Sequence, residues 1–99
     1  MDKVSLPYEL IFFDGTDEEQ RIWAISQYDI SENKPLLILT GGAPIELEKQ
    51  EKKDFYFDQG GSLTAKLGIK AVPAVVSQHE KSLLIREIKL SGVRDARIS

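Results

Sequence analysis

The chain has 99 residues, the size of one domain, and 41% of them are hydrophobic, which is enough to form a core. The formal net charge of −3 argues against nucleic acid as a partner, because phosphate binding requires a clustered basic face. The lack of cysteine excludes disulfides and thiol chemistry, and a single histidine argues against a transition-metal site, so we expect neither a metal nor a cofactor.

The first elements along the chain are a strand and a helix. Residues Tyr8–Phe13 are rich in strand-forming residues and are followed by an Asp-Gly turn signal. The four residues from Thr16 to Glu19 match a capping box, in which the Thr16 hydroxyl accepts from the Glu19 N–H. We therefore expect a helix that begins after Thr16 and runs to about Asp29.

The middle of the chain predicts two more strands around a second helix. The continuous apolar run Pro35–Thr40 is typical of a strand that is buried on both faces of a parallel sheet. Pro44 suits the first position of a surface helix that continues to Lys52. Residues Asp54–Asp58 predict the third strand.

The last predicted elements are a short helix and a hairpin. Ser62–Leu67 is the helix, and Gly68 stands in the usual position of a C-terminal stop. Pro73–Gln78 and Ser82–Ile88 are the hairpin strands, joined by a turn in which His79 is expected to be solvated. The order β-α-β-α-β-α-β-β predicts one α/β domain, residues 1–99, whose mixed sheet has parallel members and an antiparallel edge.

The C-terminal tail leaves one face of this hairpin open. We expect the ordered core to span about residues 7–88 and the tail, 89–99, to be flexible, since Gly92 makes it poor helix material. Alternation in the last strand places Leu84 and Ile88 on one face. An apolar patch of this kind usually marks an interface, so either a partner or the tail covers it.

The run Gly68-Ile69-x-x-Val72-Pro73, placed before the hairpin, resembles the thioredoxin fold, as does the element order. This resemblance implies a five-stranded mixed sheet of order 1-3-2-4-5 with helices on both faces, a strand Tyr8–Phe13 at the edge, and a cis Val72–Pro73 bond. It also implies that Gly42-Ala43-Pro44-Ile45 replaces the Cys-Gly-Pro-Cys motif that faces the proline loop. Without sulfur there is no disulfide exchange, so we expect no enzyme of that class.

Three longer segments carry a closer resemblance: LIFFDGTDEEQRIWA, LLILTGGAPIEL and FYFDQGGSLTAKLGIKAVPAVVSQHEKSLLIREI. They are similar to the C-terminal domain of the TraW family of F-type conjugative pilus assembly. The resemblance implies a periplasmic scaffold in a type IV secretion system, with a TrbC-type pilus assembly protein as its partner. Because the N-terminus lacks the features of a signal peptide, a periplasmic chain would be an excised domain. No apolar run is long enough to predict a membrane span.

These resemblances predict which residues contact the partner. The predicted contact residues are Gly42, Ala43, Pro44, Ala71, Val72, Pro73, Leu84 and Ile88. The alternative is that these glycines and prolines serve turn geometry alone.

The expected function is therefore that of a non-catalytic adaptor or scaffold, and two other functions stay open beside it. One is a chaperone-like peptide binder without a fixed partner. The other is a glutathione-binding enzyme of the same fold that uses the Thr40 hydroxyl, although no base accompanies it. Asp14, Asp17 and Asp58 follow strands, but a calcium site needs a denser set of oxygens, and turn chemistry explains them better.

Overall fold

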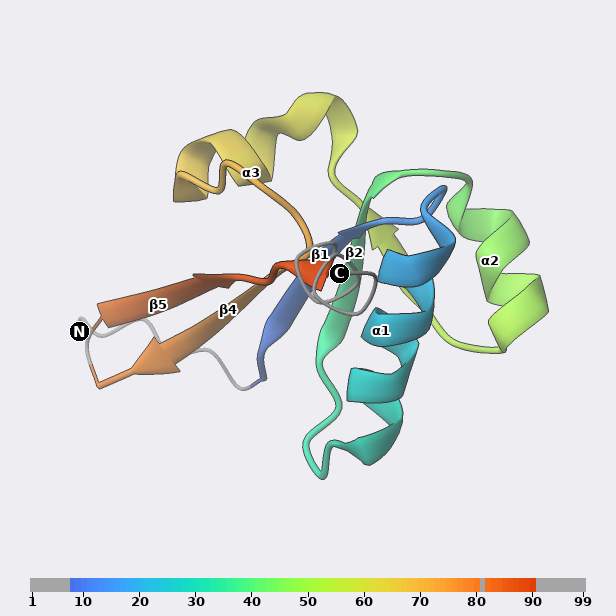
Figure 1. Cartoon of the computed structure of the whole chain (residues 1–99), viewed down its shortest axis with the longest axis horizontal. Coiled ribbons are helices and arrows are strands. Elements are labelled where there is room, and N and C mark those ends of the chain that lie inside the picture. Colours follow the sequence, from blue (N-terminus) through green and yellow to red (C-terminus); the bar gives the residue numbers. More distant parts are fainter. Residues whose placement is uncertain (1–7, 81, 91–99) are drawn as a thin grey trace, which may run out of the picture.

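The computed structural model describes residues 8–80 and 82–90 and contains every strand and helix that the sequence predicts (Figure 1). The element bounds differ from the predicted ones by two residues at most. In chain order they are β1 (Leu10–Asp14), α1 (Glu18–Ile30), β2 (Leu36–Gly41), α2 (Pro44–Glu51), β3 (Phe55–Phe57), a 3-10 turn (Gln59–Gly61), α3 (Ser62–Leu67), β4 (Ala74–His79) and β5 (Ser82–Glu87). The predictions for the His79 side chain and for the tail from residue 91 onward lie outside the described residues.

The five strands form one sheet in the order β3-β2-β1-β4-β5. β1 is parallel to β2 and antiparallel to β4, and β4 and β5 form the antiparallel hairpin. The expected order 1-3-2-4-5 is therefore wrong, and β1 lies at the centre of the sheet rather than at its edge. The physical reason is the apolar content of β1, because Ile11, Phe12 and Phe13 are at most 2% exposed and face opposite sides of the sheet.

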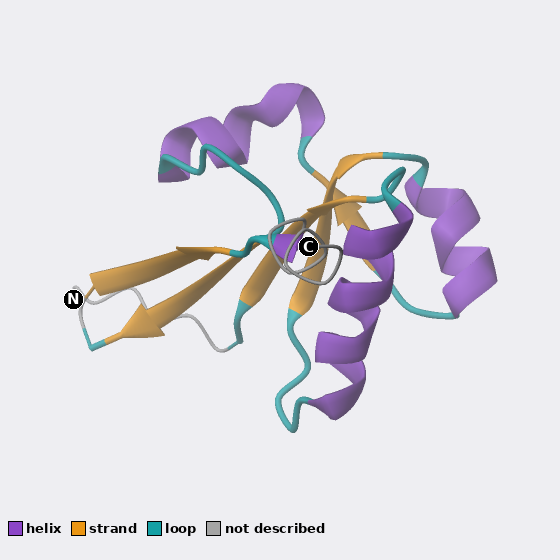
Figure 2. Ribbon diagram, viewed as in Figure 1, coloured by secondary structure: helices purple, strands orange, loops and turns teal. Residues whose placement is uncertain are grey.

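Helices cover both faces of this sheet, as expected. α1 and α2 pack on one face, where Ile11, Phe13, Leu37 and Leu39 meet Ala24 of α1 and Leu47 of α2. α3 lies on the opposite face (Figure 2). There Leu67 packs against a second cluster of Phe12, Ile38 and Val76. Within the described part of the chain, no helix has the length and apolar character needed to cross a membrane.

The start of α1 is capped by a different residue from the one expected. The Asp17 carboxylate accepts hydrogen bonds from the backbone N–H groups of Glu19 and Gln20, so Asp17 is the N-cap. The Thr16 hydroxyl instead donates to Asp14 Oδ1 at 2.7 Å. Both residue types are good caps. β1 extends one residue further than predicted, to Asp14, and α1 begins one residue later, at Glu18, so the cap position falls on Asp17.

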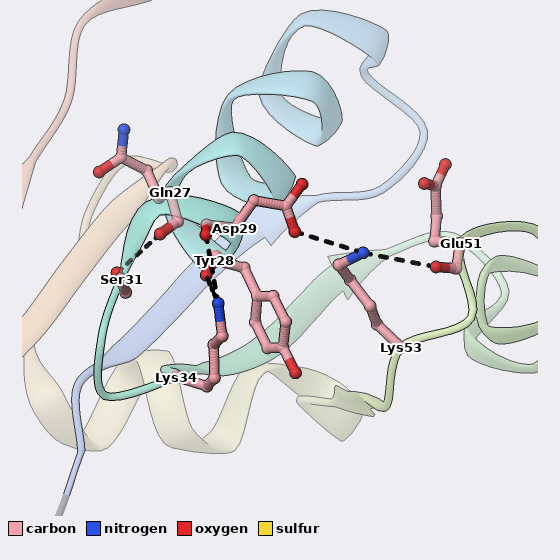
Figure 3. Close-up of polar contacts among 7 residues, drawn as sticks. All are labelled: Gln27, Tyr28, Asp29, Ser31, Lys34, Glu51 and Lys53. Atoms are coloured by element: carbon pink, nitrogen blue, oxygen red, sulfur yellow. Dashed lines mark hydrogen bonds and ion pairs between the residues drawn. The ribbon is translucent and has the colours of Figure 1, made fainter.

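The other end of α1 is held by two lysines (Figure 3). Lys34 Nζ donates to the Tyr28 and Asp29 carbonyl oxygens at 2.9 and 3.2 Å, which satisfies acceptors at the helix end. Lys53 forms an ion pair of 3.4 Å with Asp29. Both ammonium groups lie near the Tyr28 ring, 5.0 and 5.4 Å from its centroid. These contacts fix the end of α1 against the segments that enter β2 and β3.

Candidate functional site

The loop that precedes β4 is held in place by β5. This proline loop, Ala71–Pro73, contains the cis Val72–Pro73 bond, as predicted. The Glu87 carboxylate accepts from the backbone N–H groups of Lys70 and Ala71 at 2.8 and 3.2 Å. The Ile88 N–H donates to the Pro73 carbonyl oxygen at 2.8 Å. The loop is therefore fixed on its β5 side.

A pocket of about 210 Å³ lies between the proline loop and the start of α1. β1 is the neighbour of β4 in the sheet, so the end of β1 and the beginning of α1 lie beside the beginning of β4. The residues that line this proline-loop pocket are Asp17, Glu19, Gln20, Ala71, Val72, Pro73, Ile88, Lys89 and Leu90.

The α1 wall of the pocket is built from side chains with fixed hydrogen bonds. Asp17 caps the helix, and its second oxygen accepts from Gln20 Nε2 at 3.2 Å. Gln20 Oε1 accepts from the backbone N–H of Asp14 at 2.8 Å, at the point where β1 ends. This chain of contacts ties the pocket wall to the central strand.

The pocket joins an apolar surface to main-chain polar groups of the proline loop. Val72, Pro73, Ile88 and Leu90 supply the apolar part, while Asp17 and Glu19 place carboxylates on the opposite wall. Among the described residues, the Val72 N–H and C=O form no hydrogen bond. A backbone amide that has no partner among the described residues is a natural partner for the main chain of an extended peptide.

The structure brings together only half of the predicted contact residues. Ala71, Val72, Pro73 and Ile88 all line the pocket. Leu84 lies outside it, on β5, where it is 47% exposed.

The expectation that Gly42-Ala43-Pro44 faces the proline loop is wrong. None of these three residues lines the pocket. A Cβ on Gly42 would be 3.3 Å from the Gly15 backbone, so this turn packs on the turn after β1. The cause is the strand order: α1, rather than α2, follows the strand next to β4. Whether Gly42–Pro44 contacts a partner stays a prediction.

Sequence reasoning missed the residues of the α1 wall, Asp17, Glu19 and Gln20, as well as Lys89 and Leu90. A signal for the first three was available. Residues Leu10–Phe13 form an apolar run without alternation, just as Leu36–Leu39 do, and such a run indicates a strand buried on both faces. A central β1 next to the strand of Pro73 would have placed the start of α1 opposite the proline loop.

The other acidic candidates are held by local hydrogen bonds. Asp14 Oδ1 accepts from the Thr16 N–H and hydroxyl. Asp58 is 3% exposed and its carboxylate accepts from the backbone N–H groups of Leu63 and Thr64 at 2.8 and 3.0 Å. Burial raises the pKa of Asp58, but these hydrogen bonds outweigh it and hold the pKa below its usual value. Asp58 therefore orders the start of α3.

One curated relative shows a clear sequence match. Protein TraW of Escherichia coli strain K12 is 37% identical to this chain over 68 residues, which are 69% of this chain and 32% of that protein. The chain thus spans about a third of the length of this relative. No family model matches the chain, and no solved structure matches it. The comparisons therefore relate more than two thirds of this chain to one part of Protein TraW.

Proposed function

We propose that this chain is a non-catalytic adaptor of thioredoxin-like fold that docks a TrbC-type protein during conjugative pilus assembly in the periplasm. The observation that carries the proposal is the proline-loop pocket. It combines an apolar surface with a backbone amide, that of Val72, which forms no hydrogen bond with any described residue, in a chain that is 37% identical to Protein TraW over 68 residues.

The topology supports the thioredoxin-like part of the proposal. A parallel pair, β1 and β2, is joined by α1, and an antiparallel hairpin, β4 and β5, is placed next to β1. The cis Val72–Pro73 bond precedes β4. The start of α1 therefore takes the place opposite the proline loop that the redox motif has in thioredoxins, and here it reads Thr16-Asp17-Glu18-Glu19.

The chemistry of this segment supports an adaptor rather than an enzyme. The chain has no cysteine, and Asp17, which lines the pocket, is engaged as a helix cap. We propose that the partner lays an extended segment along the proline loop, where its main chain pairs with Val72 and an apolar side chain contacts Ile88. Such strand addition takes affinity from main-chain hydrogen bonds and specificity from side-chain pockets.

The test is an NMR titration of the 99-residue chain with the N-terminal part of its cognate TrbC-type protein. We expect amide shifts at Ala71, Val72, Ile88 and the start of α1. The blocking variant is Ala71→Arg, which places a long cation on an exposed position of the proline loop. The matched control is Ala65→Arg, an equally exposed alanine on α3.

The outcomes separate the proposed site from other surfaces. Loss of binding in Ala71→Arg with retention in Ala65→Arg supports docking at the pocket. Shifts confined to Gly42–Pro44 or to Leu84 would move the site to those predicted residues. An absence of shifts at millimolar partner would overturn the docking proposal.

A further inference from the structure

β5 forms one edge of the sheet, and among the described residues no strand pairs with its outer side. β5 has six residues and lies at the end of the sheet, whereas the opposite edge strand, β3, has three. Leu83 and Leu84 face opposite sides of the sheet and are 46% and 47% exposed. A long edge strand with apolar side chains on both faces is a template for pairing with another strand.

The register of the hairpin shows which main-chain groups point outward. Ile88 N–H donates to Pro73 O, so the pair Pro73–Ile88 is hydrogen-bonded. In an antiparallel pair such positions alternate, and Val76 lies opposite Ile85. The N–H and C=O groups of Leu83, Ile85 and Glu87 are therefore directed away from β4, toward the open edge.

The side chains of β5 are self-complementary in one antiparallel register. If Leu84 lies opposite Leu84 of a second copy, Leu83 lies opposite Ile85 and Ser82 opposite Arg86, and the outward main-chain groups meet one another. A shift that centres the pair on Ile85 sets Leu83 against Glu87 and Leu84 against Arg86. A further shift sets Arg86 against Arg86, and like charges directly opposite are destabilising.

We propose that β5 pairs with β5 of a second copy of this chain, antiparallel and centred on Leu84, so that two five-stranded sheets become one. The pairing covers Leu84 on one face and the Leu83–Ile85 contacts on the other. It uses a surface apart from the proline-loop pocket and does not rest on the proposed function. Because the pairing involves a single strand edge, we expect a weak dimer.

The first test uses the lack of native cysteine, which makes a single introduced thiol unambiguous. Centring on Leu84 makes it a non-hydrogen-bonded pair with Cα atoms about 4.5 Å apart, within the range of a disulfide. We expect Leu84→Cys to cross-link to a covalent dimer on mild oxidation. Ile30→Cys is the matched control, because Ile30 is 75% exposed and is the last residue of α1 rather than part of a strand. Equal cross-linking of the two variants overturns the proposal.

The second test places charges at position 84, where the two copies would face each other. Self-association of the full chain is measured by sedimentation velocity at rising concentration. We expect Leu84→Lys alone and Leu84→Glu alone to weaken self-association roughly tenfold, and an equimolar mixture to restore it. Ile30→Lys should associate like the unmodified chain. A chain that stays monomeric at millimolar concentration overturns the proposal, as does a mixture that associates no better than either variant. If only the TrbC-type protein shifts the β5 amides, the edge belongs to that partner, and self-pairing is likewise overturned.

Discussion

The carboxylate of Glu87 on β5 accepts a hydrogen bond of 2.8 Å from the backbone N–H of Lys70, seventeen residues earlier in the chain. The same oxygen accepts from Ala71, so one exposed side chain holds the segment that leads into the proline loop. We predict that Glu87→Ala lowers the free energy of unfolding by about 1 kcal/mol, because charge-assisted bonds to main-chain amides are lost. Hydrogen exchange at Lys70 and Ala71 should accelerate. Glu46→Ala, on the exposed side of α2, is the control, and unchanged exchange at both amides would contradict the prediction.

The buried carboxylate of Asp58 makes stability depend on pH. Its folded-state pKa is lowered, so its contribution is fully present above the unfolded pKa of about 3.9 and is lost as the pH falls toward the folded-state value. We predict that Asp58→Asn costs about 1–3 kcal/mol at neutral pH and reduces the loss of stability in acid. Urea unfolding between neutral pH and pH 3 measures both effects. Asp54→Asn, an exposed neighbour, should behave like the unmodified chain; a similar cost for the two variants would refute the role of burial.

Two neighbouring residues compete as the cap of α1, and the structure selects Asp17. We predict that Asp17→Ala lowers the free energy of unfolding by about 1 kcal/mol, the usual cost of a lost cap. Thr16→Ala should cost less, because it removes only a local contact with Asp14. Thermal unfolding of the two variants compares the two losses of stability. A larger loss in Thr16→Ala would indicate that Thr16, and not Asp17, caps α1.

A substitution at Gly42 tests whether the fold requires glycine in the turn before α2. Gly42 has a φ of 100°, and a Cβ there would lie 3.3 Å from the Gly15 backbone. Gly60 also has a positive φ, 65°, but a Cβ there would have no neighbour within 4 Å. We predict that Gly60→Ala costs about 1 kcal/mol and that Gly42→Ala costs at least twice as much. Equal losses in chemical denaturation would argue that Gly42 is not kept for geometry.

The local structure could be read from the sequence because it depends on local chemistry. Pro44 begins α2, and Gly68 ends α3 in the left-handed conformation, as their residue types predict. The arrangement of the strands could not be read in the same way, because pairing depends on burial over the whole sheet. The resemblance to thioredoxins carried a strand numbering in which the first strand is an edge, and this choice overrode the apolar run Leu10–Phe13.

Only the part of the candidate site that depends on local structure could be predicted from the sequence. The proline loop and Ile88 are adjacent through the hairpin, which a turn signal predicts. The α1 wall meets them only because β1 pairs with β4, with Phe12 opposite Ala74. The sequence carries only an indirect signal for this contact, the apolar run of β1. It therefore predicts Asp17 as part of a helix start and as a weak metal-ligand candidate, and does not single out Gln20.

The two walls of the proline-loop pocket come from opposite ends of the domain, so binding of a partner in the pocket is coupled to folding of the whole chain. One wall comes from residues 17–20 and the other from residues 71–73 and 88–90, so no fragment that lacks either end of the domain contains the pocket. A partner that touches both walls binds the folded chain and not the unfolded one. By mass action it raises the free energy of unfolding of the entire domain, by about 2.7 kcal/mol at a free concentration of a hundred times its dissociation constant. The melting temperature of this chain would then rise when the partner is bound in the pocket.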